Sequence, residues 1–170
     1  MLRLLQRRLL LSQRMRRGLL LQERLLQRDL LLRIPSDMNG RRPVVLVVDD
    51  ESSIRTTMCA VLTLKDFFPM PADSVKAALK ILGTERIDAM VLDVRLPDET
   101  GRYRSGLDLL QFVRATPEYV QMPVLVLSGQ PLSSGEDQLV IAQGAHLFYK
   151  PQPYSDLFDY LRDLLEHPPQ

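Results

Sequence analysis

Five side chains able to take part in phosphoryl chemistry stand where short apolar runs stop: the adjacent pair Asp49 and Asp50, and Asp93, Ser128 and Lys150. Carboxylates gathered in one place repel one another strongly unless a cation joins them. Carboxylate oxygens suit Mg²⁺, which would also neutralise a transferred phosphoryl group. A carboxylate can itself accept a phosphoryl group covalently, and a lysine and a hydroxyl can then hold the phosphoryl oxygens. The residue types therefore indicate a phosphoryl-accepting aspartate beside a magnesium site, provided that the fold brings them together.

The apolar runs predict five β-strands that alternate with five helices. The expected strands are 44–48, 67–72, 89–92, 123–127 and 146–149; the expected helices are 107–115, 135–143 and 155–166, preceded by two that end near 65 and 82. We expect Ser52 or Ser53 to cap the first helix and Asp73 or Ser74 to cap the second. Two prolines in 67–72 predict an edge strand, because proline cannot donate to a sheet ladder.

This alternation predicts parallel crossovers and a doubly wound α/β sheet. In such sheets, function lies at the carboxyl ends of the central strands. The five polar residues stand at those ends, so we expect them to share one crevice. Taken singly, Asp49 or Asp50 could instead cap the following helix, Asp93 and Ser128 could be turn residues, and Lys150 could be a surface charge.

Four motifs in this order resemble the response-regulator receiver family over about residues 43–166: VVLVVDDE at 44–51, MVLDVRLPDETG at 90–101, PVLVLSG at 123–129 and YKP at 149–151. The resemblance implies a flavodoxin-like sheet of strand order 2-1-3-4-5. It implies that Asp93 is the phosphoacceptor and that Asp49, Asp50 and the backbone carbonyl of Arg95 bind Mg²⁺. It also implies that Ser128 turns toward the phosphoryl group, that Lys150 pairs with it, and that the Lys150–Pro151 bond is cis.

The chain departs from the family pattern in two places. Arg-Tyr-Arg-Ser at 102–105 lengthens the loop beside the acceptor, either as a solvated loop or as a partner contact through Tyr103. The family's switch aromatic, three residues before the lysine, is replaced by Leu147, while the spacing from Gly144–Ala145 points to Phe148. Arg95 has two open interpretations: a side chain that senses the phosphoryl group, or a solvated one.

The resemblance implies a stand-alone, cytoplasmic phosphoacceptor of a His-Asp phosphorelay rather than an enzyme. A histidine kinase or phosphotransfer protein would donate the phosphoryl group. The expected downstream protein partner docks on the face formed by 135–166, a weak homodimer is an option, and no DNA-binding output domain is expected. The alternative is an adaptor module that uses the fold without phosphorylation. A phosphohydrolase would need an acid two residues after Asp93, where Arg95 stands.

The first 38 residues differ in character from the rest. Residues 1–33 hold fourteen leucines, nine arginines and two acidic residues, a balance of 9 − 2 = +7, whereas 34–170 carry 13 − 19 = −6. Their leucines recur about every five residues and spread around a helix, which excludes a clean amphipathic stripe. The segment is a basic tether, a targeting peptide or an upstream stretch without a role, and we expect the domain to span 41–168.

The single Cys59 excludes an internal disulfide, and no apolar run approaches the ~18 residues of a transmembrane segment.

Overall fold

The computed structural model describes residues 41–97, 105–150 and 153–167. The leucine-arginine extension 1–38, most of the inserted loop 102–105 and Pro151 lie outside the described residues. Within them, no helix is both long and apolar enough to cross a bilayer.

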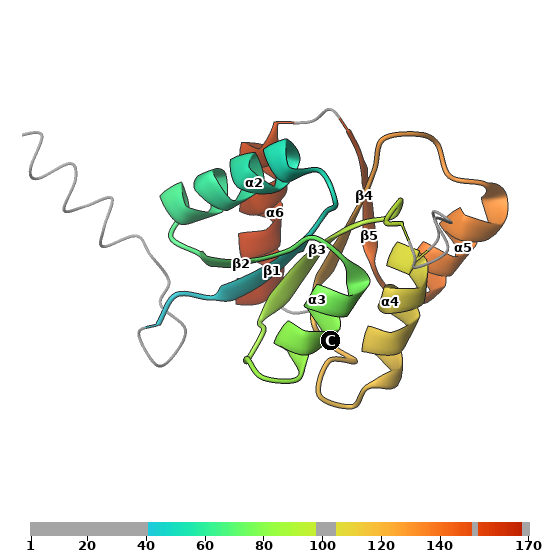
Figure 1. Cartoon of the computed structure of the whole chain (residues 1–170), viewed down its shortest axis with the longest axis horizontal. Coiled ribbons are helices and arrows are strands. Elements are labelled where there is room, and N and C mark those ends of the chain that lie inside the picture. The colour runs from blue at the N-terminus through green and yellow to red at the C-terminus, as the bar shows by residue number, and fades with distance from the viewer. Residues whose placement is uncertain (1–40, 98–104, 151–152, 168–170) are drawn as a thin grey trace, which may run out of the picture. The chain divides into compact units, whose positions relative to one another are not determined.

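Five parallel strands form one sheet in the order β2-β1-β3-β4-β5, as the resemblance implied (Figure 1). The strands are β1 Val44–Val48, β2 Phe68–Ala72, β3 Ala89–Asp93, β4 Val124–Ser128 and β5 His146–Tyr149. Every residue of β3 and β4 is buried, because helices cover both faces of these central strands. β2, which carries the two prolines, lies at an edge as predicted. Asp93 and Ser128 are the last residues of their strands, so their backbones belong to the rigid sheet.

The five described helices are α2 Ser52–Leu64, α3 Val75–Leu82, α4 Ser105–Ala115, α5 Ser134–Ala142 and α6 Tyr154–Glu166. Successive strand residues point to opposite faces, which divides the core into two layers. On one face Val45 and Val47 pack with the buried side chains of α2 and α6. On the other, Leu46 and Val48 pack with those of α3, α4 and α5, the arrangement visible in Figure 1. Within the described residues, helices therefore cover both faces of the sheet and leave the strand ends open to a ligand.

The predicted helix caps were right for α3 and wrong for α2. The Ser74 hydroxyl accepts a hydrogen bond from the backbone N–H of Ala77. At α2 the capping position is Glu51, which makes no side-chain cap bond. The Ser53 hydroxyl donates instead to the Glu51 carboxylate, at 2.6 Å, and the Asp49 carboxylate accepts a hydrogen bond from the Glu51 N–H. The start of α2 is thus organised by the acidic residue at the end of β1.

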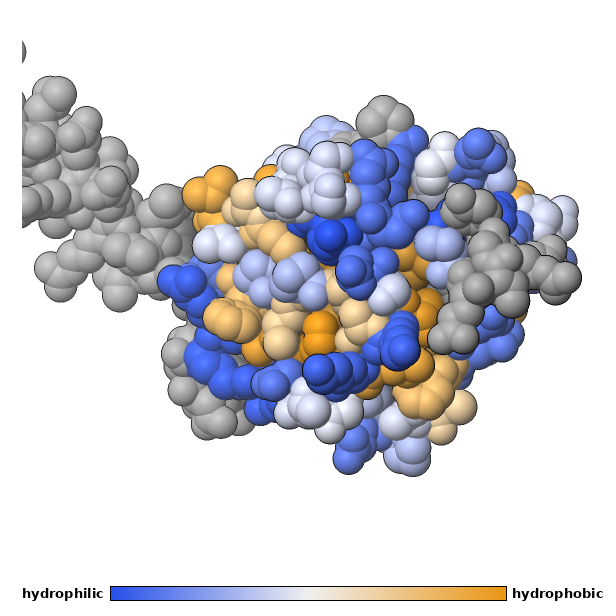
Figure 2. Space-filling view, in the orientation of Figure 1, coloured by the Kyte–Doolittle hydropathy of each residue, from blue (hydrophilic) through white to orange (hydrophobic). Residues whose placement is uncertain are grey.

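Exposed apolar side chains are scattered over the surface. Figure 2 shows hydrophobic residues between hydrophilic ones over α3 and α4, where Leu79 and Phe112 are exposed. On the side of α5 and β5, Ile141 and Tyr149 are exposed by 67% and 42%. The latter two lie on elements of the face 135–166, which the sequence predicted to meet a partner.

Candidate functional site

A lysine bridges two buried carboxylates at the carboxyl edge of the sheet. The Nζ atom of Lys150, just after β5, lies 2.7 Å from Asp49 Oδ2 and 3.0 Å from Asp93 Oδ1. The Asp49 and Asp93 side chains are only 1% and 8% exposed, and that of Lys150 is 16% exposed. The ends of β1, β3 and β5 therefore meet through one ammonium group.

The backbone around each member holds this bridge in place. Asp49 Oδ1 accepts the Glu51 N–H at 2.9 Å, and the Asp49 carbonyl accepts the Arg55 guanidinium at 2.6 Å. The Lys150 N–H donates to the Ser128 carbonyl at 2.8 Å, which extends the pairing of β5 with β4. These contacts fix the backbone from which the Asp49 and Lys150 side chains extend.

Asp93 carries its charge against the preference of its surroundings. Burial raises the pKa of its carboxyl, hydrogen bonding and attraction to Lys150 lower it, and the charges of Asp49 and Asp50 raise it, with a net rise. Burial opposes the charge of Lys150 as well, but its contacts with Asp49 and Asp93 outweigh that cost and raise the pKa of the ammonium. The Lys150 ammonium is therefore held in its charged form, whereas at Asp93 burial outweighs the attraction of Lys150 and disfavours the carboxylate.

The donor chemistry fits a hard cation, but the carboxylates do not converge in this structure. Asp49, Asp50 and Asp93 offer only oxygen ligands, the set that Mg²⁺ prefers. Among the described residues no three acidic, histidine or cysteine side chains are grouped as a metal site. Asp50 is exposed, and Lys150 occupies the position between the other two. If the Lys150 ammonium moved out from between them, Asp49 and Asp93 could bind a cation together with Asp50 and the backbone carbonyl of Arg95.

Ser128 is fully buried at the end of β4 with its hydroxyl directed along its own loop. The hydroxyl donates to the Gln130 carbonyl at 2.5 Å and lies 3.4 Å from the Gln130 N–H. The predicted contact with a group on Asp93 would require this hydroxyl to leave Gln130.

Comparison with known proteins decides the family. Residues 45–162 match the response regulator receiver domain. The chain belongs to that family.

The receiver domain has relatives and structural neighbours in several organisms. An NtrX-like response regulator of Rickettsia bellii is 38% identical over 85 residues, which are 50% of this chain and 17% of that protein. The two-component response regulator ORR5 of rice is 29% identical over 69% of this chain and 85% of its own length. A response regulator receiver protein of Pseudomonas putida superimposes with a TM-score of 0.63, at 28% identity over 72% of this chain and 97% of that one. The CheY4 chemotaxis protein of Vibrio cholerae gives 0.62 at 27% identity, over 71% and 97% of the two chains.

The structure separates the two candidates for the switch residue. Alternation along β5 sends Leu147 into the layer of α3, α4 and α5, where it is half-buried. Phe148 points to the opposite layer, where its ring meets Tyr160 of α6 edge-on at 5.6 Å. Of the two, only Leu147 lies on the face of the helix that follows β4, and by the same alternation the exposed Tyr149 at the end of β5 shares that face.

Two residues matter to the site that the sequence did not single out. A Cβ atom on Gly106 would lie 2.2 Å from the Asp93 carbonyl oxygen, so α4 approaches the acceptor too closely for any side chain. Glu136 is a buried carboxylate in the first turn of α5, bonded to Arg95 and Ser133. The S-x-x-E pattern at 133–136 is a recognisable capping-box signal, whereas Gly106 gives only the weak signal of a glycine near a helix start.

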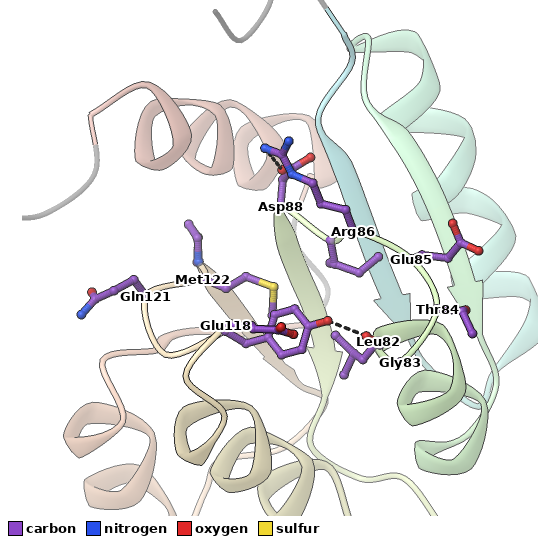
Figure 3. A pocket seen from close by; sticks show the side chains of 12 residues that line it. Leu82, Gly83, Thr84, Glu85, Arg86, Asp88, Glu118, Gln121 and Met122 are labelled. Carbon is purple, nitrogen blue, oxygen red and sulfur yellow. Dashed lines mark hydrogen bonds and ion pairs between the residues drawn. The ribbon is translucent and has the colours of Figure 1, made fainter. Parts of the chain in front are cut away.

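A hollow at the opposite edge of the sheet carries no comparable chemistry. It measures about 610 Å³ and lies between 82–88 and 118–123 (Figure 3). Two of its polar side chains hold loops together: Asp88 pairs with Arg86 and Arg41, and the Tyr119 hydroxyl donates to the Leu82 carbonyl. These contacts tie loops together at the amino ends of the strands, away from Asp93.

Replacing Asp93 by asparagine is expected to raise the free energy of unfolding at pH 7 by about 1 kcal/mol. The pKa of Asp93 is raised in the folded state above its ordinary 3.8. The folded protein therefore loses stability as the pH rises through that raised pKa, a loss that asparagine avoids. The gain should disappear as the pH falls toward 3.8. Urea denaturation across this range measures it.

The control for this measurement is Asp108→Asn on the exposed side of α4, which should change stability by less than about 0.5 kcal/mol at every pH. A loss of stability in Asp93→Asn at pH 7 would contradict the prediction, because it would mean that the attraction to Lys150 outweighs burial.

Proposed function

We propose that Asp93 accepts a phosphoryl group from a histidine kinase or phosphotransfer protein in a His-Asp phosphorelay, and that the unit carrying this function spans 41–168. The observation that carries the proposal is the buried bridge Asp49–Lys150–Asp93. A carboxylate oxygen of Asp93 would attack the phosphorus of phosphohistidine. The P–N bond would break with its electron pair returning to the imidazole, and an acyl phosphate would form.

The neighbouring groups have roles in this proposal that follow from their present positions. Lys150 already contacts Asp93, so its ammonium is close enough to pair with phosphoryl oxygens. The Ser128 hydroxyl would exchange the Gln130 carbonyl for a phosphoryl oxygen. Mg²⁺, when bound by Asp49, Asp50, Asp93 and the Arg95 carbonyl, would neutralise charge on the transferred group.

The signal would leave through protein contacts. Receiver domains are typically non-enzymatic signalling domains, so the acyl phosphate would act by shifting a conformational equilibrium. The exposed Ile141 and Tyr149 support a partner at the face formed by 135–166. Because Phe148 packs against α6, the equilibrium would involve α5 and the loop before it rather than a rotamer of Phe148.

The test is intact-mass measurement after incubation with acetyl phosphate and Mg²⁺. Wild type should gain the mass of one phosphoryl group, and Asp93→Asn should gain none, because the amide cannot form the acyl phosphate. The matched control is Asp73→Asn, an exposed aspartate that follows β2 at the same edge of the sheet and should be phosphorylated like wild type. An unmodified wild type, or equal modification of Asp93→Asn, would overturn the proposal and favour an adaptor that uses the fold without phosphorylation.

A further inference from the structure

Glu136 is a buried carboxylate outside the acceptor bridge, and its surroundings connect it to Asp93. It lies in the first turn of α5 with its side chain 10% exposed. Its Oε2 atom accepts hydrogen bonds from the Ser133 N–H at 2.9 Å and the Ser133 hydroxyl at 2.7 Å, which completes a capping box. Its Oε1 atom lies 3.1 Å from Nη1 of Arg95. The carboxylate thus joins the start of α5 to the loop that follows β3.

Arg95 is attached to the acceptor at its other end. Its backbone N–H donates to Asp93 Oδ2 at 3.2 Å, and its side chain reaches α5, 41 residues further along the chain. One residue therefore contacts both the carboxylate that would be modified and the first turn of a helix. The Arg95 side chain is 36% exposed, so it has room to change partners.

We infer that Arg95 and Glu136 form a positioning pair that reports the state of Asp93 to α5; the inference rests on phosphorylation of Asp93. A phosphoryl group carries roughly two negative charges and several strong acceptor oxygens where the carboxylate carried one charge. Arginine binds such oxygens with paired hydrogen bonds, so the phosphoryl group competes with Glu136 for the guanidinium.

The consequence for α5 follows from the burial of Glu136. When Arg95 moves toward Asp93, the Glu136 carboxylate keeps its Ser133 donors but loses the contact of its Oε1 atom with the Arg95 guanidinium. Removing a cationic partner from a buried carboxylate is costly, so the first turn of α5 opens more readily. The change begins on the face 135–166.

Hydrogen exchange of residues 133–142 measures this opening. Without a phosphoryl donor, Glu136→Gln should exchange about threefold to tenfold faster than wild type, because glutamine retains the capping bonds but removes the ionic partner of Arg95. Arg95→Ala should give a similar increase and Arg95→Lys a smaller one. The matched control is Asp137→Asn, which removes the same charge from the same helical turn without touching Arg95, and should leave exchange close to wild type.

Phosphorylation distinguishes signalling from a merely structural pair. Acetyl phosphate with Mg²⁺ should speed exchange at 133–142 in wild type and add no further increase in Glu136→Gln, where the pair is already broken. Intact mass is recorded on the same samples. Wild type that carries the phosphoryl group without faster exchange in α5, or Glu136→Gln that responds fully, would overturn the inference and leave the proposed phosphorylation standing. Absence of the phosphoryl mass would instead overturn the proposed function.

Discussion

Replacing Lys150 by methionine is expected to lower the free energy of unfolding by about 3 kcal/mol at pH 7 in the absence of divalent cations. The substitution keeps most of the apolar length of the side chain and removes the ammonium that joins Asp49 Oδ2 to Asp93 Oδ1. Both carboxylates would remain buried, with like charges and no cation between them. Losing one partner of a buried charged group is costly for this reason, whereas losing an exposed pair is not.

The loss should depend on pH in a defined direction. In Lys150→Met the remaining influences on Asp93, which are burial and the charges of Asp49 and Asp50, all raise the pKa of its carboxyl. The folded variant would therefore take up a proton at a higher pH than the unfolded chain. Its stability falls as the pH rises through the raised pKa, so the deficit is largest at neutral pH and shrinks as the pH approaches 3.8. Urea denaturation at pH 7 and at about pH 4.5 compares the two conditions.

Lys65→Met is the matched control. Lys65 also pairs with an aspartate, at 2.5 Å from Asp159, but that carboxylate is 64% exposed. The same substitution should cost less than about 1 kcal/mol there and show no recovery at low pH. Addition of Mg²⁺ should restore part of the stability of Lys150→Met alone, because a cation replaces the ammonium between the carboxylates. Equal losses in both variants would contradict the importance of the buried bridge.

The sequence predicted those parts of the fold that depend on local pattern. Unbroken apolar runs located β1, β3 and β4, and Pro69 and Pro71 placed β2 at an edge, because burial and proline geometry act on each segment separately. Polar residues at strand ends indicated one site, because parallel strands end at a common edge. Ser74 was recognisable as a cap for the same local reason.

What the sequence did not predict depends on competition between partners. Ser53 has the residue type of a cap, but the nearby Glu51 carboxylate binds its hydroxyl. Arg95 could be solvated or turned to the site, and only the position of α5 shows that it meets Glu136. The sequence predicted a metal cation among the three carboxylates, whereas in the structure the Lys150 ammonium lies between Asp49 and Asp93. The last two of these choices are made across the fold, between residues about 40 and 100 positions apart.

Gly106 is a further residue whose role the sequence did not predict, because that role depends on the backbone of β3 packed against it. It is the second residue of α4, and an added Cβ would meet the Asp93 carbonyl oxygen at 2.2 Å and the Val94 carbonyl oxygen at 2.8 Å. Both atoms belong to the backbone at the end of β3, which cannot move aside as a side chain would. α4 therefore packs against the acceptor through bare backbone.

Gly106→Ala should consequently lower the free energy of unfolding by about 3 kcal/mol, although alanine normally stabilises a helix by about 1 kcal/mol relative to glycine. The matched control is Gly135→Ala, at the second residue of α5, where nothing lies within 4 Å of the added Cβ. That variant should gain about 0.5–1 kcal/mol. Urea denaturation measures both variants. A loss of stability in Gly106→Ala with a gain in Gly135→Ala would show that the contact with β3 outweighs helix propensity, and a gain in both variants would contradict the close approach. Because relief of the clash must displace either α4 or the Asp93 carbonyl, Gly106→Ala should also take up phosphoryl from acetyl phosphate more slowly than Gly135→Ala.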